Sequence, residues 1–282
     1  MPVALLKKPV PLLKMNDGLL IPQLGFGVWK ISQHDVKNAV EQAIKTGYRH
    51  IDTAKAYNNE EGVGQGVAQS GIDRKNIFLT TKVWNTDQGY DKTMQAFEES
   101  AKRLGVNAID LYLIHWPVPA RDLFVETWKA LIRLKQENRI RSIGVCNFRI
   151  VDLERLIKET GVAPAINQVE LHPQFQQKQL RIFHDKNNIL TEAWAPLGRG
   201  QFLDNPVLQK IADEHHKTVA QIILRWHMEM GTVAIPKSRS PQRMAENFDI
   251  FDFQLTAANH DAIATLDRAD GRLGPDPSEY QG

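Results

Sequence analysis

Four polar side chains that follow short apolar runs have the chemistry needed to reduce a carbonyl group. Asp52, Lys82 and His115 each stand at or near the end of such a run, and Tyr57 follows the run that contains Asp52. Hydride transfer leaves negative charge on a carbonyl oxygen, so the site needs a proton donor and positive or hydrogen-bonding groups aimed at that oxygen. A phenol, an ammonium, a carboxylate that holds the ammonium and an imidazole supply these functions.

Tyr57 needs help to act as an acid near neutral pH, because a phenol has a reference pKa near ~10. Lowering that pKa by two to three units takes about 3 to 4 kcal/mol, comparable with one ammonium at roughly 4 Å in a surface-like dielectric. We therefore expect Lys82 to acidify Tyr57, Asp52 to hold Lys82, and a neutral His115 to orient the substrate oxygen. Taken singly, each side chain also fits an ordinary structural role, and a histidine at the end of an apolar strand is more often a hydrogen-bonded core residue than a catalyst.

A second group of residues could bind an anion near the end of the chain. Ser240 followed by Pro241 is typical of a helix start, with the serine as N-cap and the proline in the first turn. Such a start offers free backbone N–H groups to an anion. Lys237, Ser238 and Arg243 surround it. The sequence predicts an anion site here, although a basic helix start without function has the same pattern.

Eight apolar or β-branched runs alternate with stretches of helical periodicity, which is typical of parallel βα units. The expected strands are Leu24–Trp29, His50–Ala54, Ile77–Lys82, Ile109–Trp116, Ser142–Asn147, Ala165–Glu170, Leu190–Leu197 and Thr232–Lys237. In a parallel barrel all the carboxyl ends open onto one cavity, so the polar residues at these ends would share a site. The pattern favours an α/β fold, a (β/α)8 TIM barrel.

Amphipathic stretches between the strands predict the helices of the barrel wall. They include Val36–Ile44, Thr93–Leu104, Trp128–Leu134 and Leu153–Ile157. Two further helices, about Thr218–Met230 and Ala257–Leu266, bracket the last strand. Asn16-Asp17-Gly18 indicates a hairpin over about residues 10–23, which we expect to close the bottom of the barrel. The Gly- and Pro-rich tail, about 269–282, is expected to lie over the mouth.

The same alternation also fits a doubly wound sheet. That fold would place a G-x-G-x-x-G loop between its first strand and first helix. Here Gly25-Phe26-Gly27 continues into Val28 and Trp29, and the glycines Gly62, Gly64 and Gly66 lie within a helical stretch. The missing loop favours the barrel.

Length and composition indicate one domain over residues 1–282. The chain has 282 residues, is 42% hydrophobic and shows no linker or repeat, so it can bury one large core. Its net charge is +2, from 35 basic and 33 acidic residues without long runs of either sign. This balance gives little electrostatic support for nucleic-acid or membrane-surface partners.

The single cysteine, Cys146, excludes an intrachain disulfide and a clustered-cysteine zinc site. Met1–Lys14 is broken by prolines and lysines and lacks the apolar stretch of a signal peptide. No segment is long and apolar enough to span a bilayer. We expect a cytoplasmic monomer that works on a small molecule.

The sequence resembles the aldo-keto reductase family in seven short motifs that occur in the family's order. The motifs are Ile51-Asp52-Thr53-Ala54 with Tyr57-Asn58-Asn59-Glu60, Thr81-Lys82-Val83-Trp84, Leu113-Ile114-His115-Trp116-Pro117, Gly144-Val145-Cys146-Asn147-Phe148, Asn167-Gln168-Val169-Glu170, Pro196-Leu197-Gly198 and Ile235-Pro236-Lys237-Ser238. The resemblance covers about Leu12 to Asp267. It implies that Tyr57, Lys82, Asp52 and His115 are the catalytic residues of an NADPH-dependent carbonyl reductase.

The resemblance also implies a cofactor site along the carboxyl ends of the strands. Asn147 and Gln168 would hold the nicotinamide carboxamide, and Trp194 would stack on the ring. Lys237, Ser238, Arg243 and Asn247 would take the adenosine end, with the cations facing the 2′-phosphate, so NADPH is expected over NADH. The remaining implied cofactor contacts are Gly27, Val28, Trp29, Asp52, Ala195, Leu197, Gly198 and Glu246.

Three positions depart from the common family pattern. Cys146 and Ala195 stand where serine is commoner, and Trp194 stands where tyrosine is commoner. The loss of hydroxyls puts the detailed cofactor contacts in doubt but leaves the four catalytic positions unchanged.

The sequence indicates the substrate less clearly than it indicates the reaction and the cofactor. Trp29, Trp84 and Trp116, with Tyr57 and His115, are expected to line its pocket. The short tail and the stretch from Trp194 to Gly200 look like bacterial 2,5-diketo-D-gluconate reductases, which suggests small dicarbonyls and keto-sugar acids. Arg199 or Arg272 could receive a substrate carboxylate.

Two other readings remain open at this point. A nucleotide-binding structural or regulatory protein of the same fold would not need the complete set of tyrosine, lysine, aspartate and histidine. A metal hydrolase on the same barrel is disfavoured because the first strand has no H-x-H pair. We therefore expect no metal.

Overall fold

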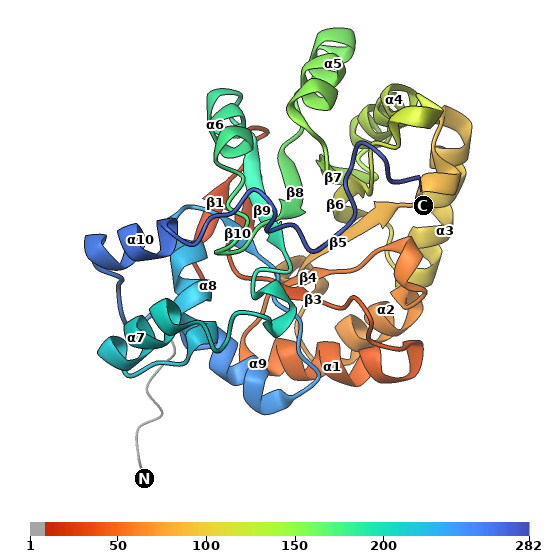
Figure 1. Cartoon of the computed structure of the whole chain (residues 1–282). Coiled ribbons are helices and arrows are strands. Elements are labelled where there is room, and N and C mark those ends of the chain that lie inside the picture. The colour runs from red at the N-terminus through yellow and green to blue at the C-terminus, as the bar shows by residue number, and fades with distance from the viewer. Residues whose placement is uncertain (1–8, 282) are drawn as a thin grey trace.

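Eight parallel strands, β3 to β10, pair in chain order and form a single curved sheet (Figure 1). The computed structural model describes residues 9–281. Residues 1–8, which belong to the segment predicted to lack a signal peptide, lie outside the described residues. The strands are β3 (Phe26–Gly27), β4 (His50–Asp52), β5 (Phe78–Val83), β6 (Ile109–Ile114), β7 (Ile140–Cys146), β8 (Ile166–Glu170), β9 (Leu190–Trp194) and β10 (Val233–Ala234). Gly25 N–H donates to Ala234 O at 2.9 Å, which joins the first strand to the last. The (β/α)8 barrel predicted from the sequence is confirmed.

Ten helices surround the barrel strands in the part of the chain described. They are α1 (Gln33–Thr46), α2 (Glu60–Gln69), α3 (Tyr90–Leu104), α4 (Phe124–Gln136), α5 (Ile150–Thr160), α6 (Lys178–Lys186), α7 (Pro206–His215), α8 (Val219–Glu229), α9 (Pro241–Phe248) and α10 (Ala257–Ala264). Ser32, Thr218 and Thr256 are N-caps whose side chains accept a backbone N–H from the first turn. The two helices predicted to bracket the last strand are α8 and α10.

The predicted hairpin consists of β1 (Leu12–Lys14) and β2 (Leu20–Pro22), which pair antiparallel. Met15 and Ile21 are buried in a cluster with residues at the amino ends of strands, including Phe78 and Val233. The Asn16 amide donates to Pro164 O at 2.8 Å, just before β8. The hairpin therefore closes the bottom of the barrel, opposite the carboxyl ends of the strands.

The C-terminal tail makes its contacts at the other end of the barrel. Leu273 and Gly274 donate their N–H groups to the carboxylate of Glu170, the last residue of β8. The Tyr280 ring lies 4.3 Å from that of Trp116, which follows β6. In Figure 1 the dark blue tail runs from α10 across the strands.

Several strands end earlier than the sequence predicted. The predicted runs to Asn147 and Leu197 pass through residues with left-handed backbone, Asn147 with φ 64° and Ala195 with φ 49°. A strand cannot continue through such a residue, so these side chains stand in loops just beyond β7 and β9. No helix within residues 9–281 has the length and hydropathy needed to cross a membrane.

Candidate active site

A buried ion pair joins the ends of two neighbouring strands. Lys82 Nζ on β5 donates to Asp52 Oδ1 at 2.6 Å and to the carbonyl of Thr53 at 2.9 Å. Lys82 is 0% exposed and Asp52 is 1% exposed. Burial lowers the pKa of Lys82, but the charge and hydrogen bond of Asp52, together with contributions from Tyr57 and Cys146, outweigh it, so the pKa of Lys82 lies above its usual value. The pair thus provides a fixed positive charge at the carboxyl end of the sheet.

Tyr57 ends a short 3-10 helix, η1 (Lys55–Tyr57), that follows β4. Its ring centroid lies 5.3 Å from Lys82 Nζ. Burial raises the pKa of the Tyr57 phenol above its usual value, and Asp52 also raises it, while the charge and hydrogen bond of Lys82 lower it. The net acidification of Tyr57 that the sequence led us to expect is therefore wrong, because desolvation outweighs the ammonium.

His115, one residue beyond β6, faces Tyr57 with ring centroids 5.8 Å apart and planes at 77°. Trp84 packs against the same imidazole at 5.1 Å, and Trp116 lies 6.5 Å away. Burial, together with the charge of Lys82, lowers the pKa of His115 well below its usual value. The imidazole is thus neutral, as the sequence analysis expected, and the structure brings all four catalytic candidates together.

The Cys146 thiol links the three predicted nicotinamide contacts into one hydrogen-bonded group, because it accepts from Asn147 Nδ2 at 3.1 Å and donates to Gln168 Oε1 at 3.7 Å. Trp194 Nε1, at the end of β9, donates to Asn147 Oδ1 at 2.8 Å, and Asn147 Nδ2 donates to His115 O at 3.0 Å. Gln168 Nε2, on β8, donates to Asp52 Oδ2 at 2.9 Å. The last bond joins strands that are not neighbours in the sheet, so it crosses the barrel interior. These amides connect the predicted cofactor residues to the ion pair.

The loop after β9 turns sharply at two predicted cofactor contacts. Gly198 N–H donates to Ala195 O at 2.8 Å across Leu197. Gly198 has φ +53°, and a Cβ there would stand 1.8 Å from the ring of Phe202. Only glycine fits this position without moving the ring, so the loop has one defined path beside Trp194.

The end of β3 and the loop after it supply the other three predicted contacts near the ion pair, Gly27, Val28 and Trp29. A Cβ at Gly27 would lie 3.0 Å from the carbonyl of Ile235, and Val28 N–H donates to Asp52 O at 3.1 Å. Trp29 is 40% exposed, with Lys30 Nζ 4.4 Å and the guanidinium of Arg199 5.2 Å from its ring. The indole thus has cations from two separate segments of the chain close to its ring.

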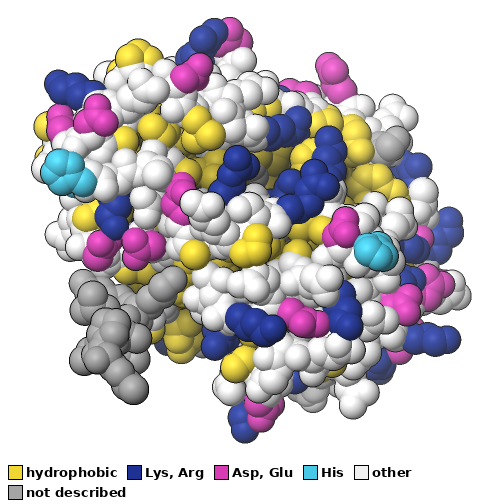
Figure 2. Space-filling model, turned by 90° about the horizontal axis from the view of Figure 1, so that it is seen from below, with side chains coloured by type: hydrophobic (Ala, Val, Ile, Leu, Met, Phe, Trp, Pro, Cys, Tyr) yellow, Lys and Arg dark blue, Asp and Glu magenta, His cyan; other side chains and the backbone are white. Residues whose placement is uncertain are grey.

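The predicted anion site lies at the start of α9. Ser240 is its N-cap and accepts Arg243 N–H. Burial lowers the pKa of Lys237, and so do the charges of Arg239 and Lys30. In Figure 2, which views the molecule from the side where α1 and α9 lie in Figure 1, Lys and Arg side chains gather around a hollow with hydrophobic side chains between them. Crowded cations beside free helix N–H groups fit the phosphates of a dinucleotide.

The remaining adenosine-end predictions lie on or next to α9. Ser238 and Asn247 are buried, at 7% and 5% exposure. Glu246 accepts a hydrogen bond from Thr218 Oγ1 at 2.8 Å, so its carboxylate already connects α9 to the start of α8. Arg239 and Lys30 were missed by the sequence reasoning, although their charges were visible beside predicted contacts.

A cavity of about 740 Å³ opens beside the carboxyl ends of β7 and β8. Asn147, Glu170 and Arg272 line it together with residues of α5 and α6. The guanidinium of Arg272 lies 4.7 Å from the ring of Phe175, whereas Arg199 packs on Trp29. The two arginines considered for a substrate carboxylate are therefore in different surroundings.

Glu192 on β9 is a site residue that the sequence analysis did not identify. Its carboxyl is 0% exposed and accepts Gln168 Nε2 at 2.9 Å, the same nitrogen that donates to Asp52. Alternation along β9 was the available signal, because it places Glu192 on the same side of the strand as Trp194.

Comparison with known proteins identifies relatives over nearly the whole chain. An aldo-keto reductase of Mycobacterium sp. (strain JLS) is 52% identical over 270 residues, covering 96% of this chain and 98% of the relative. The methylglyoxal reductase DkgA of Escherichia coli (strain K12) is 50% identical over 273 residues, with the same coverage of 96% and 98%.

Solved structures of known proteins are also similar to this chain in sequence and in fold. An aldo/keto reductase from Brucella melitensis is 62% identical, with a TM-score of 0.89 over 92% of this chain and 100% of that one. A mutant of Gox0644 in complex with NADPH is 50% identical, with a TM-score of 0.94 over 97% and 99% of the two chains. The sequence model of the Aldo/keto reductase family matches residues 23–268. The chain therefore belongs to the aldo/keto reductase family.

Proposed function

We propose that the protein is an NADPH-dependent reductase that converts aldehydes and ketones to alcohols, with Tyr57 as the proton donor. The observation that carries this proposal is the buried Lys82–Asp52 pair at 2.6 Å, with the Tyr57 ring 5.3 Å from its ammonium and His115 facing Tyr57. A proton donor, a fixed positive charge and a neutral hydrogen-bonding group thus surround one position. A carbonyl oxygen placed there would meet every requirement of the reduction.

Tyr57 can protonate the product even though burial raises its pKa. An alkoxide is a stronger base than a phenolate, so the proton moves from Tyr57 to the oxygen once negative charge has developed there. The raised pKa keeps Tyr57 protonated at neutral pH and ready to donate. Lys82 then stabilises the phenolate that remains, and Asp52 keeps Lys82 in position.

His115 acts on the same oxygen in a different way. Its low pKa keeps the imidazole neutral, so the ring can donate a hydrogen bond without competing for the transferred proton. Its contacts with Trp84 and Trp116 fix the ring plane. We propose that these two indoles and Trp29 form the walls of the substrate pocket.

We propose that NADPH binds along the groove from Trp194 to the start of α9. Bound there, it supplies the hydride. Asn147, Gln168 and Trp194 hold the nicotinamide end, and Lys237, Ser238, Arg243 and Asn247 hold the adenosine end. The intervening contacts are Gly27, Val28, Trp29, Asp52, Ala195, Leu197, Gly198 and Glu246. The crowding of Lys237 by Arg239 and Lys30 supports a 2′-phosphate at this end, because an anion there relieves the repulsion.

We propose small dicarbonyls and keto-sugar acids such as 2,5-diketo-D-gluconate as substrates. The half-identical methylglyoxal reductase DkgA supports an α-dicarbonyl. We further propose a monomer, folded as one domain, in a reducing cytoplasm, which accords with a single buried cysteine.

The test is a steady-state screen in which the purified protein, NADPH and one carbonyl compound are mixed and the absorbance of the reduced nicotinamide is followed. Methylglyoxal, 2,5-diketo-D-gluconate and simple aldehydes form the panel. We expect the highest kcat/KM with the dicarbonyls. An absence of NADPH oxidation with every compound would overturn the proposed function, and equal kcat/KM values across the panel would overturn the substrate assignment.

A further inference from the structure

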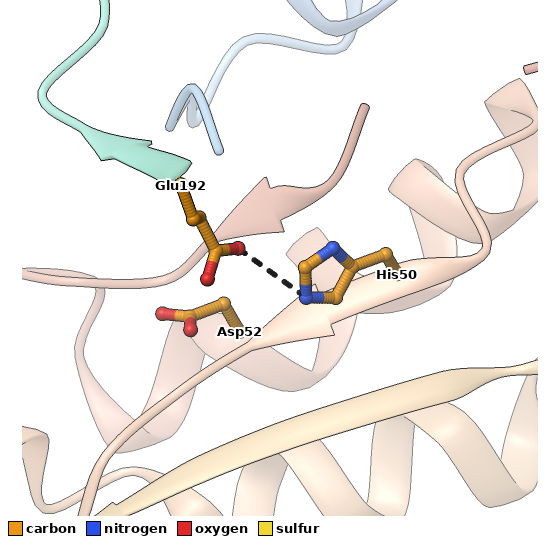
Figure 3. A group of neighbouring side chains, drawn as sticks. All are labelled: His50, Asp52 and Glu192. Atoms are coloured by element: carbon orange, nitrogen blue, oxygen red, sulfur yellow. Dashed lines mark ion pairs between the residues drawn. The ribbon is translucent and has the colours of Figure 1, made fainter. Parts of the chain in front are cut away.

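Three titratable side chains meet inside the barrel, and one of them is Asp52 of the ion pair (Figure 3). His50 and Asp52 come from β4, and Glu192 reaches toward them from β9 on the far side of the interior. One ligand atom from each lies within 4.8 Å of the others. His50 and Glu192 are 0% exposed, and Asp52 is 1% exposed. Two carboxyl groups are thus held close together away from the solvent-exposed surface, which demands a compensating cation or proton.

The hydrogen bonds at this group disfavour a metal ion. Both oxygens of Asp52 already accept hydrogen bonds, Oδ1 from Lys82 at 2.6 Å and Oδ2 from Gln168 at 2.9 Å. The Gln168 amide presents its N–H side to both carboxyl groups, since Nε2 also donates to Glu192 Oε2 at 2.9 Å. A metal ion needs lone pairs in these directions rather than N–H groups. One ammonium and one amide donor satisfy Asp52 but leave Glu192 without a countercharge.

We propose that Glu192 carries a proton in the working enzyme and, through the Gln168 amide, positions Asp52 and thereby Lys82. A neutral carboxyl can share Gln168 Nε2 with Asp52 without repelling it. An ionised Glu192 would place a second negative charge beside Asp52 and compete for the single ammonium of Lys82. Glu192 is thus a positioning residue of the proposed reaction, and this inference rests on the proposed function.

The pKa shifts of Glu192 and of the neighbouring His50 support a protonated Glu192. Burial, with a contribution from Asp52, raises the pKa of Glu192 to about 8. Burial and the charge of Lys82 lower the pKa of His50 to about 3, so the 3.8 Å contact between His50 Nε2 and Glu192 Oε1 joins two neutral groups near pH 7. Glu192 Oε1 has no hydrogen-bond partner among residues 9–281, so a negative charge on this carboxyl would be poorly compensated.

The other groups that face Glu192 do not titrate near pH 8. Lys82 on β5 has a raised pKa, and burial raises the pKa of the Cys146 thiol on β7 well above its usual value. Tyr57, whose ring lies beside Lys82, also has a raised pKa. Gln168 on β8 does not ionise. A change in behaviour between pH 7 and pH 9 at this centre therefore reports on Glu192.

The first test measures the proton without using activity. Glu192→Gln keeps the shape and the acceptor oxygen but cannot ionise. Because the folded wild type binds one more proton than the unfolded chain between about pH 4.5 and pH 8, its unfolding equilibrium constant should rise, relative to that of the variant, by up to tenfold per pH unit over that range. The ratio of the wild-type unfolding equilibrium constant to that of Glu192→Gln should level off above pH 8. Urea titrations at pH 6, 7, 8 and 9 measure it.

Asp17→Asn in the hairpin turn is the matched control. Burial of Asp17 is outweighed by hydrogen bonds from Lys135, Ser142 and the Leu19 backbone, so its pKa is lowered and it is ionised in both folded and unfolded chains above pH 6. The unfolding equilibrium constant of wild type relative to this variant should not change between pH 6 and pH 9. A ratio for Glu192→Gln that is equally flat would overturn the protonated state of Glu192.

The second test measures positioning. With saturating NADPH and methylglyoxal, wild-type kcat should fall as pH rises through about 8, whereas Glu192→Gln should keep the kcat that wild type has at pH 7. Glu192→Leu, which removes the partner of Gln168, should lower kcat at least tenfold at pH 7, and Glu192→Gln rescues it. Full kcat in the leucine variant would overturn the positioning role. A wild type that oxidises no NADPH would instead reject the proposed function, while the urea titrations still decide whether Glu192 is protonated.

Discussion

Lys82 Nζ lies 2.6 Å from Asp52 Oδ1 inside the barrel, where the two side chains are 0% and 2% exposed. Charges buried this deeply are stable only as a pair, because each alone would lack both water and a countercharge. The pair therefore constrains stability as well as chemistry.

Asp52→Asn should destabilise the protein by about 3 to 5 kcal/mol, because it leaves the Lys82 ammonium buried without its partner. It should also lower kcat at least about 100-fold, because Lys82 is no longer held beside Tyr57. The double variant Asp52→Leu with Lys82→Met is the control, and it should recover stability but not activity. Urea denaturation and NADPH oxidation measure the two effects. An Asp52→Asn protein with wild-type stability would contradict a charged, buried pair.

Arg243→Ala should weaken NADPH binding about 10- to 100-fold, because a charge-assisted hydrogen bond contributes about 1.5 to 3 kcal/mol. Binding of NADH should change less than about threefold, since it lacks the 2′-phosphate. Fluorescence titration of both cofactors measures the ratio. Arg133→Ala on α4, where the arginine pairs with Glu137 on the surface, is the matched control and should change neither affinity. Equal losses for NADPH and NADH would reject a phosphate role for Arg243.

Reversing the charge of Arg199 or Arg272 separates the two candidates for a substrate carboxylate. If one of them binds it, Arg199→Glu or Arg272→Glu should raise KM for 2,5-diketo-D-gluconate at least tenfold and leave KM for uncharged methylglyoxal unchanged. Their different partners, Trp29 and Phe175, predict that only one variant has this effect. Unchanged KM for the keto acid in both variants would exclude both arginines.

The sequence was sufficient to predict the barrel and its order of elements. Each strand shows an apolar or β-branched run, and the local turn and cap residues, such as Asn16-Asp17-Gly18 and Ser240-Pro241, agree with the fold. Strand ends were less predictable. Asn147 and Ala195 adopt left-handed backbone, which local residue preferences do not indicate, so the apolar pattern predicts strands that run through them.

Two features of the site could not be predicted from the sequence, namely the position of Glu192 and the pKa of Tyr57. Glu192 lies within a strand, where sequence alone does not distinguish a solvent-facing carboxylate from one in the barrel interior. Its contact with Gln168 follows from the register of the neighbouring strands β8 and β9, whereas its approach to Asp52 on β4 depends on the closure of the barrel. The net pKa of Tyr57 also depended on burial, because the charge of Lys82 was evident from the sequence and the degree of desolvation was not.

The most direct test of proton donation by Tyr57 is the single-turnover rate of Tyr57→Phe with bound NADPH and methylglyoxal. Phenylalanine keeps the ring that packs against His115 and removes only the hydroxyl. We predict a fall of at least about 100-fold in this rate with an unchanged affinity for NADPH, because general acid catalysis contributes roughly that factor or more. A Tyr57→Phe protein that reduces methylglyoxal at the wild-type rate would contradict the account.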